Sequence, residues 1–300
     1  MVNLVSLSPL KFYNNIKKQN RYRSFAYGNV APLITSPNSI SPFQFSVKFI
    51  DEAFSDISEV YLYDANTNER VAEGANLRDV FLEAGLSYLS GKDSIYNIIF
   101  NGKLPLNTVL KYEGLYYLNI VLKTKEDKSY GFYSEVFCYT NSIDGCIKIE
   151  YSHPDNYLYI NNGFISFDNG FKFVLYLKTE LGKPEYSFEE EVTKRLGYSF
   201  IESQVSKKTY KFNCVAPEYI CDAMRIIRLC ENKRIYYNDD TYEALTFDMS
   251  VEWQDQGDLA SVSCEFDVDN VVATLGGKMH EPLGGDFYDG DYTYDFKVEG

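Results

Sequence analysis

Apolar and polar residues alternate with a period of two along much of the chain, a pattern that is typical of half-buried β-strands. Residues 43–49 carry Phe or Val at every second position, and residues 60–62 continue the alternation up to an Asp-Ala-Asn turn. Further alternating runs cover residues 110–120 and 133–137. These runs predict a first β domain over residues 24–141.

Part of this domain has a spacing that is more specific than simple alternation. The sequence there is Leu110-x-Tyr112-x-Gly114-x-Tyr116. This spacing is like the tyrosine corner of immunoglobulin and fibronectin-III domains. In a tyrosine corner, a Tyr hydroxyl forms a hydrogen bond back across the turn that precedes a late strand. The first domain is therefore expected to be an immunoglobulin- or fibronectin-III-like β-sandwich.

The turn-rich stretch 141–145 is expected to separate this sandwich from a second β domain over residues 142–275. Alternating patterns there predict strands at residues 146–151, 246–253 and 260–268. Two more predicted strands, 164–167 and 171–175, flank Asp168-Asn169-Gly170. Because Asn-Gly between alternating apolar residues is a strong hairpin signal, these two strands are expected to pair with each other.

One helix is clearly predicted, over residues 216–231. Pro217 fits its first turn, and an acidic residue near the start with basic residues near the end suits the helix dipole. Ile220, Met224 and Ile227 form an apolar stripe along it. The expected fold class is thus mainly β, with two sandwich-like domains and this α-helix inserted in the second.

A shorter helix is predicted upstream. Ser187 with Glu190 three residues later reads as a capping box. The helix that it opens would stop at Gly197.

The charges are distributed unevenly along the chain. Residues 236–300 hold sixteen Asp and Glu and two Lys, so that the net charge of this segment is −14, the same as that of the whole protein. Residues 1–23, in contrast, hold basic residues and no acidic ones. Opposite charges at the two ends suit copies that meet head to tail, or a neighbour that docks in one orientation. A solvated tail is the alternative. We expect a basic N-terminal arm over residues 1–23 and an acidic, aromatic C-terminal tail over residues 276–300.

Each end supplies candidate residues for binding a partner. In the tail, aromatic residues stand between acidic ones, so that an extended tail can add a strand to the open sheet edge of a neighbour. The candidate residues are Lys11, Lys17, Lys18, Arg21 and Arg23 in the arm, and Asp286, Phe287, Tyr288, Asp289, Asp291, Tyr292, Tyr294, Asp295 and Phe296 in the tail.

The sequence lacks the motifs that most readily indicate catalysis. The two His residues, His153 and His280, stand in no nucleophile motif, and the zinc-protease, phosphate-loop and dinucleotide patterns are missing. A glycosidase needs only two carboxylates that the fold brings together, so that class stays open. We expect a protein that is not an enzyme and holds no cofactor.

Metal and disulfide chemistry are not expected either. The six cysteines contain no Cys-x-x-Cys pair and are interpreted as small buried apolar residues. The Asp-rich run 286–295, and Asp267 with Asp269, offer oxygen ligands that suit calcium, but without the spacing of an EF-hand. A solvated acidic segment is the simpler interpretation.

The composition also limits the possible surroundings of the protein. No run approaches the roughly 18 apolar residues of a membrane span, and the start of the chain lacks the pattern of a signal peptide. A soluble, unexported protein with no membrane partner is expected. The acidic balance argues against a specific nucleic-acid partner, which would need a basic face.

Three stretches carry a resemblance to known proteins: FYSEVF at residues 132–137, NGFISFDNGFKFVLYLKTELGKPEYSFEEE at residues 162–191, and GYSFIESQVSKKTYKFNCVAPEYICDAMRI at residues 197–226. They resemble virion proteins of tailed phages and prophages of gut Bacteroidetes, including the crAss-like group. The resemblance spans roughly residues 130–270 and brings no catalytic residues with it. It implies a subunit of a tail or connector ring near the portal, made in the bacterial cytoplasm and retained in the virion.

Two functions remain to be distinguished at this point. The first is a structural ring subunit that contacts copies of itself and neighbouring tail or portal-vertex proteins. The second is a carbohydrate- or receptor-binding module, because sandwiches with exposed Tyr and with Trp253 can stack against sugars.

Overall fold

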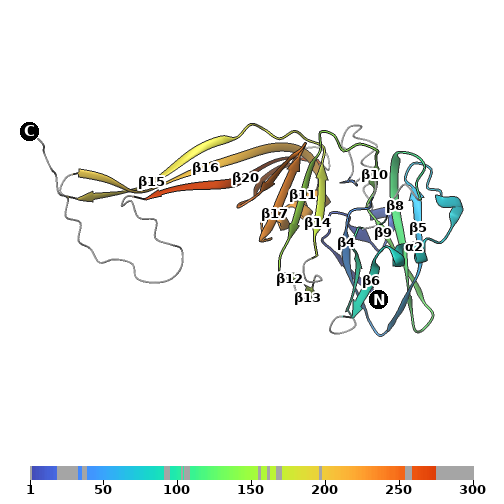
Figure 1. Ribbon diagram of the computed structural model, residues 1–300. Coiled ribbons are helices and arrows are strands. Elements are labelled where there is room, and N and C mark those ends of the chain that lie inside the picture. The colour runs from blue at the N-terminus through green and yellow to red at the C-terminus, as the bar shows by residue number, and fades with distance from the viewer. Residues whose placement is uncertain are drawn as a thin grey trace, which may run out of the picture. The chain divides into compact units, whose positions relative to one another are not determined.

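The computed structural model describes residues 2–18, 33–35, 39–90, 95–102, 104, 109–154, 157–160, 163–166, 171–195, 198–253 and 259–274. These residues are mainly β and form several antiparallel sheets (Figure 1), so that the mainly β, sandwich-like fold class is confirmed. The chain divides into two compact units. Unit 1 comprises residues 1–187 and 207–270, and unit 2 comprises residues 188–206 and 271–300.

The first sheet of unit 1 has the strand order β1-β4-β7-β6. Its strands are β1 (Val2–Ser6), β4 (Phe43–Phe49), β6 (Leu86–Ser90) and β7 (Ile95–Phe100). All three pairings are antiparallel. The alternation predicted over residues 43–49 is therefore confirmed as β4, with its Phe and Val side chains buried. A short helix that the sequence did not predict, α2 (Arg78–Glu83), precedes β6.

The second sheet has the order β2-β9-β8-β10-β3, and β5 also pairs with β8. Its strands are β2 (Phe12–Tyr13), β3 (Leu33–Ile34), β5 (Phe54–Asp64), β8 (Gly114–Thr124), β9 (Ser129–Ser134) and β10 (Phe137–Tyr139). The parallel pairing of β10 with β3 is the exception to the antiparallel pattern of this sheet. The two sheets share one hydrophobic core.

The tyrosine-corner prediction is confirmed in its geometry. The Tyr116 hydroxyl donates a hydrogen bond of 2.9 Å to the backbone carbonyl of Tyr112. Tyr116 is buried near the start of β8. The bond therefore fixes the path of the chain where it enters β8, the strand that pairs with β5 along its length. Burial raises the pKa of Tyr116 above its ordinary value.

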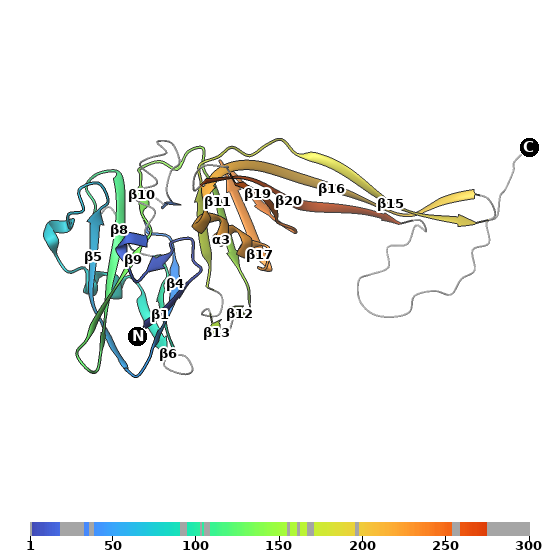
Figure 2. The same cartoon turned by 180° about the vertical axis from the view of Figure 1, so that it is seen from behind.

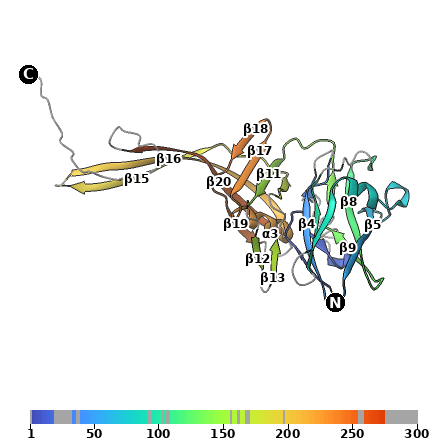
Figure 3. The ribbon, with the colours of Figure 1, turned by 60° about the horizontal axis from the view of Figure 1, so that its bottom comes forward.

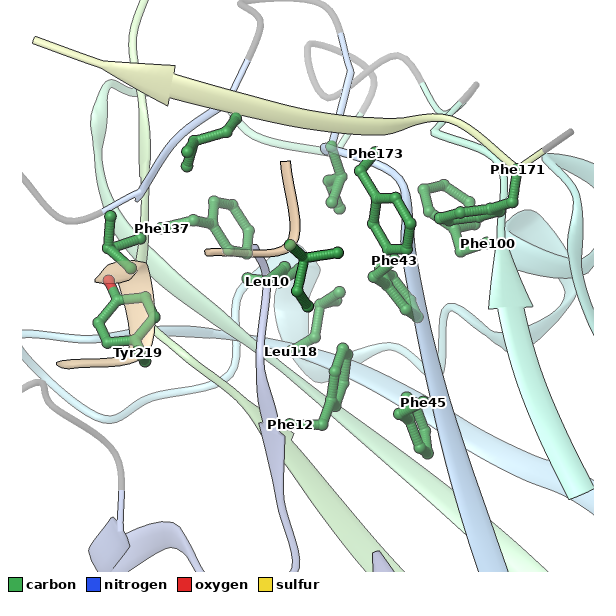
Figure 4. Close-up of a cluster of buried hydrophobic side chains, with 14 of the residues drawn as sticks. Leu10, Phe12, Phe43, Phe45, Phe100, Leu118, Phe137, Phe171, Phe173 and Tyr219 are labelled. Carbon is green, nitrogen blue, oxygen red and sulfur yellow. The ribbon is translucent and has the colours of Figure 1, made fainter. Parts of the chain in front are cut away.

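The segment that was expected to be a basic arm contains two strands. β1 pairs with β4, and β2 pairs with β9. The Phe12 ring lies 4.5 Å from that of Phe45 and 4.7 Å from that of Phe43 (Figure 4). The next residue, Tyr13, hydrogen-bonds the carboxylate of the fully buried Glu135, and burial, together with that carboxylate, raises the pKa of Tyr13. Apolar side chains on both sides of Lys11 thus make residues 2–13 part of the fold.

Gly102 follows β7 at a point where no side chain fits. Its φ is +73°, and a Cβ there would lie 2.8 Å from Cδ of Pro42 and 2.9 Å from the carbonyl oxygen of Ile40. We expect Gly102→Ala to lower the free energy of unfolding by about 2–3 kcal/mol, because strain from positive φ adds to overpacking. Denaturant unfolding measures this change.

Gly145 provides the matched control for that substitution. Its φ is +69°, but nothing lies within 4 Å of an added Cβ, so that Gly145→Ala is expected to cost about 1 kcal/mol. Equal losses in the two variants would contradict the packing argument at Gly102.

The C-terminal half of unit 1 is built on a third sheet with the order β14-β11-β17-β18. Its strands are β11 (Ile147–Ser152), β14 (Phe173–Leu177), β17 (Asn232–Tyr237) and β18 (Asp240–Glu243). Figure 4 shows Phe171 and Phe173 in the same buried cluster as Phe43 and Phe100. The boundary predicted at residues 141–145 therefore falls inside unit 1, because both halves contribute to one core.

The predicted helix is confirmed as α3 (Glu218–Ile227), shorter than expected, with Pro217 as its N-cap. Figures 2 and 3 show α3 beside strands of the C-terminal half. The Tyr151 hydroxyl on β11 donates a hydrogen bond of 3.4 Å to the carbonyl of Ala223. The buried Lys233 donates a bond of 2.6 Å to the carbonyl of Cys230, three residues after the helix, which gives its buried amine a hydrogen-bond partner.

The hairpin predicted around Asp168-Asn169-Gly170 is wrong in its pairing. β13 (Gly163–Ser166) pairs with β12 (Tyr157–Ile160), whereas β14 pairs with β11. The whole turn, together with Phe167, lies outside the described residues. The turn sequence predicted that β14 pairs with β13, its neighbour along the chain, but β14 pairs instead with the more distant strand β11.

The short helix predicted from Ser187 to Gly197 is also wrong. Residues 187–195 belong to β15 (Glu185–Arg195), the first strand of a fourth sheet with the order β15-β16-β20-β19, and residues 196–197 lie outside the described residues. The other strands are β16 (Tyr198–Pro217), β19 (Asp248–Trp253) and β20 (Leu259–Thr274). Tyr186, Phe188 and Val192 recur at even positions, and such aromatic and β-branched residues favour a strand over the helix that the capping box predicts.

Candidate functional site

The most unusual surface of the described residues lies in unit 2, on neighbouring parts of β15 and β16. We call residues 188–195 of β15 together with 198–206 of β16 the ribbon. Wherever the exposure of a side chain is described in the ribbon, it is exposed or half-buried, and none is buried. Phe188 is 65% exposed, Val192 47% and Ile201 40%. The ribbon therefore has large apolar side chains but no core of its own to bury them.

Side-chain hydrogen bonds join the two strands of the ribbon at its acidic run. Nε2 of Gln204 donates to Oε1 of Glu190 over 2.8 Å, and the Ser203 hydroxyl donates to Oε2 of Glu191 over 3.2 Å. Because successive residues of a strand face opposite sides, these two bonds lie on opposite faces. Both bonds are exposed, so their net contribution is about 1 kcal/mol each at most.

The outer edge of the ribbon is open among the described strands, because β15 is the last strand of its sheet (Figure 3). An edge strand presents a row of backbone N–H and C=O groups that can pair with another chain. β16 pairs with β20 on its other side, so that the open edge of the ribbon belongs to β15 alone. Exposed apolar side chains and an open edge together make the ribbon a candidate interaction surface.

The sequence-predicted contact residues are only partly placed by the structure. Lys11 lies 3.4 Å from Asp222 of α3 and is therefore used within unit 1. Lys17 and Lys18 are exposed in a short 3₁₀ helix, Ile16–Lys18. Arg21, Arg23 and the predicted tail residues, from Asp286 to Phe296, lie outside the described residues.

A second candidate is a hollow of about 240 Å³ on the third sheet, lined by charged residues that include Lys172 and Arg234. Its ion pairs are internal to the sheet: Arg234 contacts Glu243 at 2.6 Å, and Lys148 contacts Glu150 at 2.5 Å. Burial acts to raise the pKa of Glu150, but bonds from Lys148 and the Tyr236 hydroxyl hold it below its ordinary value. The Arg234–Glu243 pair links the neighbouring strands β17 and β18, and the Lys148–Glu150 pair lies along β11, so that the two acids of the hollow have partners within the sheet.

In the described part of the chain, no residues are arranged as a metal site or as a disulfide. No cluster of His, Cys, Asp or Glu there has the arrangement of a metal site. All six cysteines are free. The expected burial is confirmed for Cys221, Cys230 and Cys264, whereas Cys138, Cys146 and Cys214 are half-buried. Asp267 accepts a hydrogen bond of 2.6 Å from Thr209. Among the described helices, none has the length and apolar character needed to cross a bilayer.

The ribbon was missed by the sequence analysis, although a signal for it exists. The capping-box spacing drew attention to Ser187 and Glu190, whereas the alternation of Tyr186, Phe188 and Val192 pointed to a strand. Comparisons with known proteins add nothing to this geometry: no family model matches the chain, and no curated protein or solved structure gives a significant match.

Proposed function

We propose that the protein is a structural subunit that works through contacts with other protein chains rather than through catalysis. The observation that supports this proposal is the ribbon, which exposes Phe188, Val192 and Ile201 beside an open sheet edge. A surface of this kind gains stability when another chain extends the sheet and covers the apolar side chains. The ribbon is thus proposed as the site of assembly.

The resemblance of residues 130–270 to phage virion proteins gives the proposal a particular setting. In this setting the protein is a subunit of a tail or connector ring in a tailed bacteriophage. Copies of the chain would contact each other and neighbouring tail or portal-vertex proteins. The protein would be made in the bacterial cytoplasm and retained in the virion.

Excision of the ribbon tests the proposed function. Residues 188–206 are replaced by Asn-Gly, a two-residue turn that suits a hairpin. We expect the wild-type chain to sediment as an assembly and the excised chain, which lacks the ribbon contact, to sediment as a smaller species. The reason is that excision removes the exposed edge but leaves the buried core of unit 1.

Denaturant unfolding of the excised chain provides the control. A cooperative transition close to that of the wild-type protein shows that unit 1 is intact. A folded, excised chain that assembles like the wild-type protein would contradict the proposal.

A carbohydrate- or receptor-binding module is the second candidate. The observation that favours it is Trp253, which is 51% exposed at the end of the edge strand β19 and offers an aromatic face on which a sugar can stack. Saturable glycan binding by a protein that stays a single chain would support this function over that of a structural subunit.

A further inference from the structure

The exposed strand of the ribbon is complementary in charge to a reversed copy of itself. Its residues 188–195 read Phe-Glu-Glu-Glu-Val-Thr-Lys-Arg, with three acids before the central Val192 and two bases after it. Glu189, Glu190 and Lys194 are all exposed. When two such strands run antiparallel, the acidic half of one lies along the basic half of the other.

Symmetry limits the ways in which two identical strands can pair. Around a two-fold axis one residue lies opposite its own copy, and residues at equal distances before and after it lie opposite each other. With Val192 on the axis, Glu190 stands opposite Lys194. This pair occurs twice, so that the register makes two pairs of opposite charge.

The two neighbouring registers toward the acidic half are worse. With Glu190 on the axis, it faces its own copy and Glu189 faces Glu191 twice, so that three pairs of like charge meet across the strands. With Glu191 on the axis, it again faces its own copy. Opposite charges directly across a strand pair stabilise it by about 0.2–1 kcal/mol each, and like charges destabilise it. Among the registers centred on Glu190, Glu191 and Val192, the order of charges therefore favours the one centred on Val192.

We infer that β15 is the contact through which two copies of this chain pair, antiparallel and edge to edge, about a two-fold axis at Val192. The inference rests on the proposed function, since it names the partner of the ribbon and the register. Pairing would join the two sheets into one across the β15 edges and satisfy the backbone groups that each edge leaves open. A carboxylate accepts several hydrogen bonds, so that Glu190 can keep its bond from Gln204.

A two-fold contact has a consequence for any larger assembly. It joins two copies and then closes, whereas a ring needs a head-to-tail contact that repeats. The β15 contact therefore joins copies in pairs. In a virion it would connect subunits of two facing rings.

Charge reversal at Glu190 and Lys194 tests the pairing. Glu190→Lys or Lys194→Glu alone places like charges opposite each other twice, and each is expected to raise the dissociation constant of the pair about tenfold or more. The double variant restores opposite charges and should return to within about threefold of the wild-type value. Analytical ultracentrifugation over a concentration series measures all three.

The other edge strand of the same sheet provides a matched control. Glu252 is an exposed glutamate on β19, and Glu252→Lys should leave the dissociation constant within about threefold of wild type. Failure of the double variant to recover, or an equal loss in Glu252→Lys, would overturn the inferred register.

A cysteine at the axis tests the register independently. Residues opposite each other in an antiparallel pair have Cα atoms about 4.5–5.5 Å apart, within the range of a disulfide. Val192→Cys should therefore form a covalent dimer under mild oxidation. Ile201→Cys, an exposed position on β16, should not, and wild-type protein controls for its own six thiols.

The outcomes separate the inference from the proposed function. If Val192→Cys does not cross-link but excision of the ribbon still abolishes assembly, the two-fold pairing is wrong and the proposed function stands. If the wild-type chain is single at every concentration, both are wrong.

Discussion

Phe12→Ala is expected to lower the free energy of unfolding by about 3–5 kcal/mol, the range for truncation of a fully buried Phe. Phe12 is 1% exposed and lies between the rings of Phe43 and Phe45. Its removal leaves a cavity against β4, to which the surrounding sheets can adjust only in part. Denaturant unfolding followed by tryptophan or tyrosine fluorescence measures the loss.

Phe188 provides a matched control for this prediction, because it is the same residue on the exposed ribbon. Phe188→Ala should change the free energy of unfolding by no more than about 0.5 kcal/mol. If Phe12→Ala costs less than about 1 kcal/mol, residues 2–13 are an accessory arm, and the packing described for β2 is wrong.

The second large effect is a loss of stability at alkaline pH. Burial raises the pKa of Cys214, Cys221 and Cys230 from 9.0 to about 11, and it raises that of Cys264 still further. Between pH 9 and 11 the unfolded chain releases these thiol protons and the folded chain keeps them. The folded state then binds more protons than the unfolded state, so that the free energy of unfolding falls as pH rises.

The size of this effect is large because several thiols act together. Each of the three that rise to about 11 contributes roughly 2–3 kcal/mol at the upper end of the window. Their stabilising contribution is fully present below pH 9. One group opposes the trend, since burial lowers the pKa of Lys233. The sum of the thiol effects approaches the 5–15 kcal/mol by which an ordinary domain is stable.

Urea unfolding at pH 8, 9, 10 and 11 under reducing conditions measures the alkaline loss. We expect the midpoint to be nearly constant up to pH 9 and to fall steeply above it. Cys230→Ala removes one of the thiols, so its free energy of unfolding should fall less steeply with pH than that of the wild-type protein. A midpoint that stays constant from pH 8 to 10.5 would contradict the burial of these thiols.

Much of the fold follows from local sequence. Alternation at residues 43–49 is enough to define β4, because each buried Phe or Val stands two positions from the next. The Tyr116 hydrogen bond follows from its spacing to Tyr112. The apolar stripe of α3 likewise predicts a helix, although its ends depend on where Pro217 starts it and where β17 must begin.

The remainder depends on contacts between distant parts of the chain. Nothing local to β14 shows that it pairs with β11 rather than with β13. The capping box at Ser187 predicts a helix, and β16 overrides it by supplying a strand partner. The open edge of the ribbon could not be predicted for the same reason. Whether a strand lies at an edge depends on the order of all the strands in the sheet, which the local sequence does not show.

The mass of the wild-type protein in solution tests the central claim most directly. Light scattering over a range of concentrations, at low and at high salt, should give a multiple of the mass of one chain at low salt. That mass should fall toward one chain at high salt, because salt screens the charge pairs between Glu190 and Lys194. The mass of a single chain at every concentration and at both salt levels would contradict the claim that the ribbon joins copies of this protein.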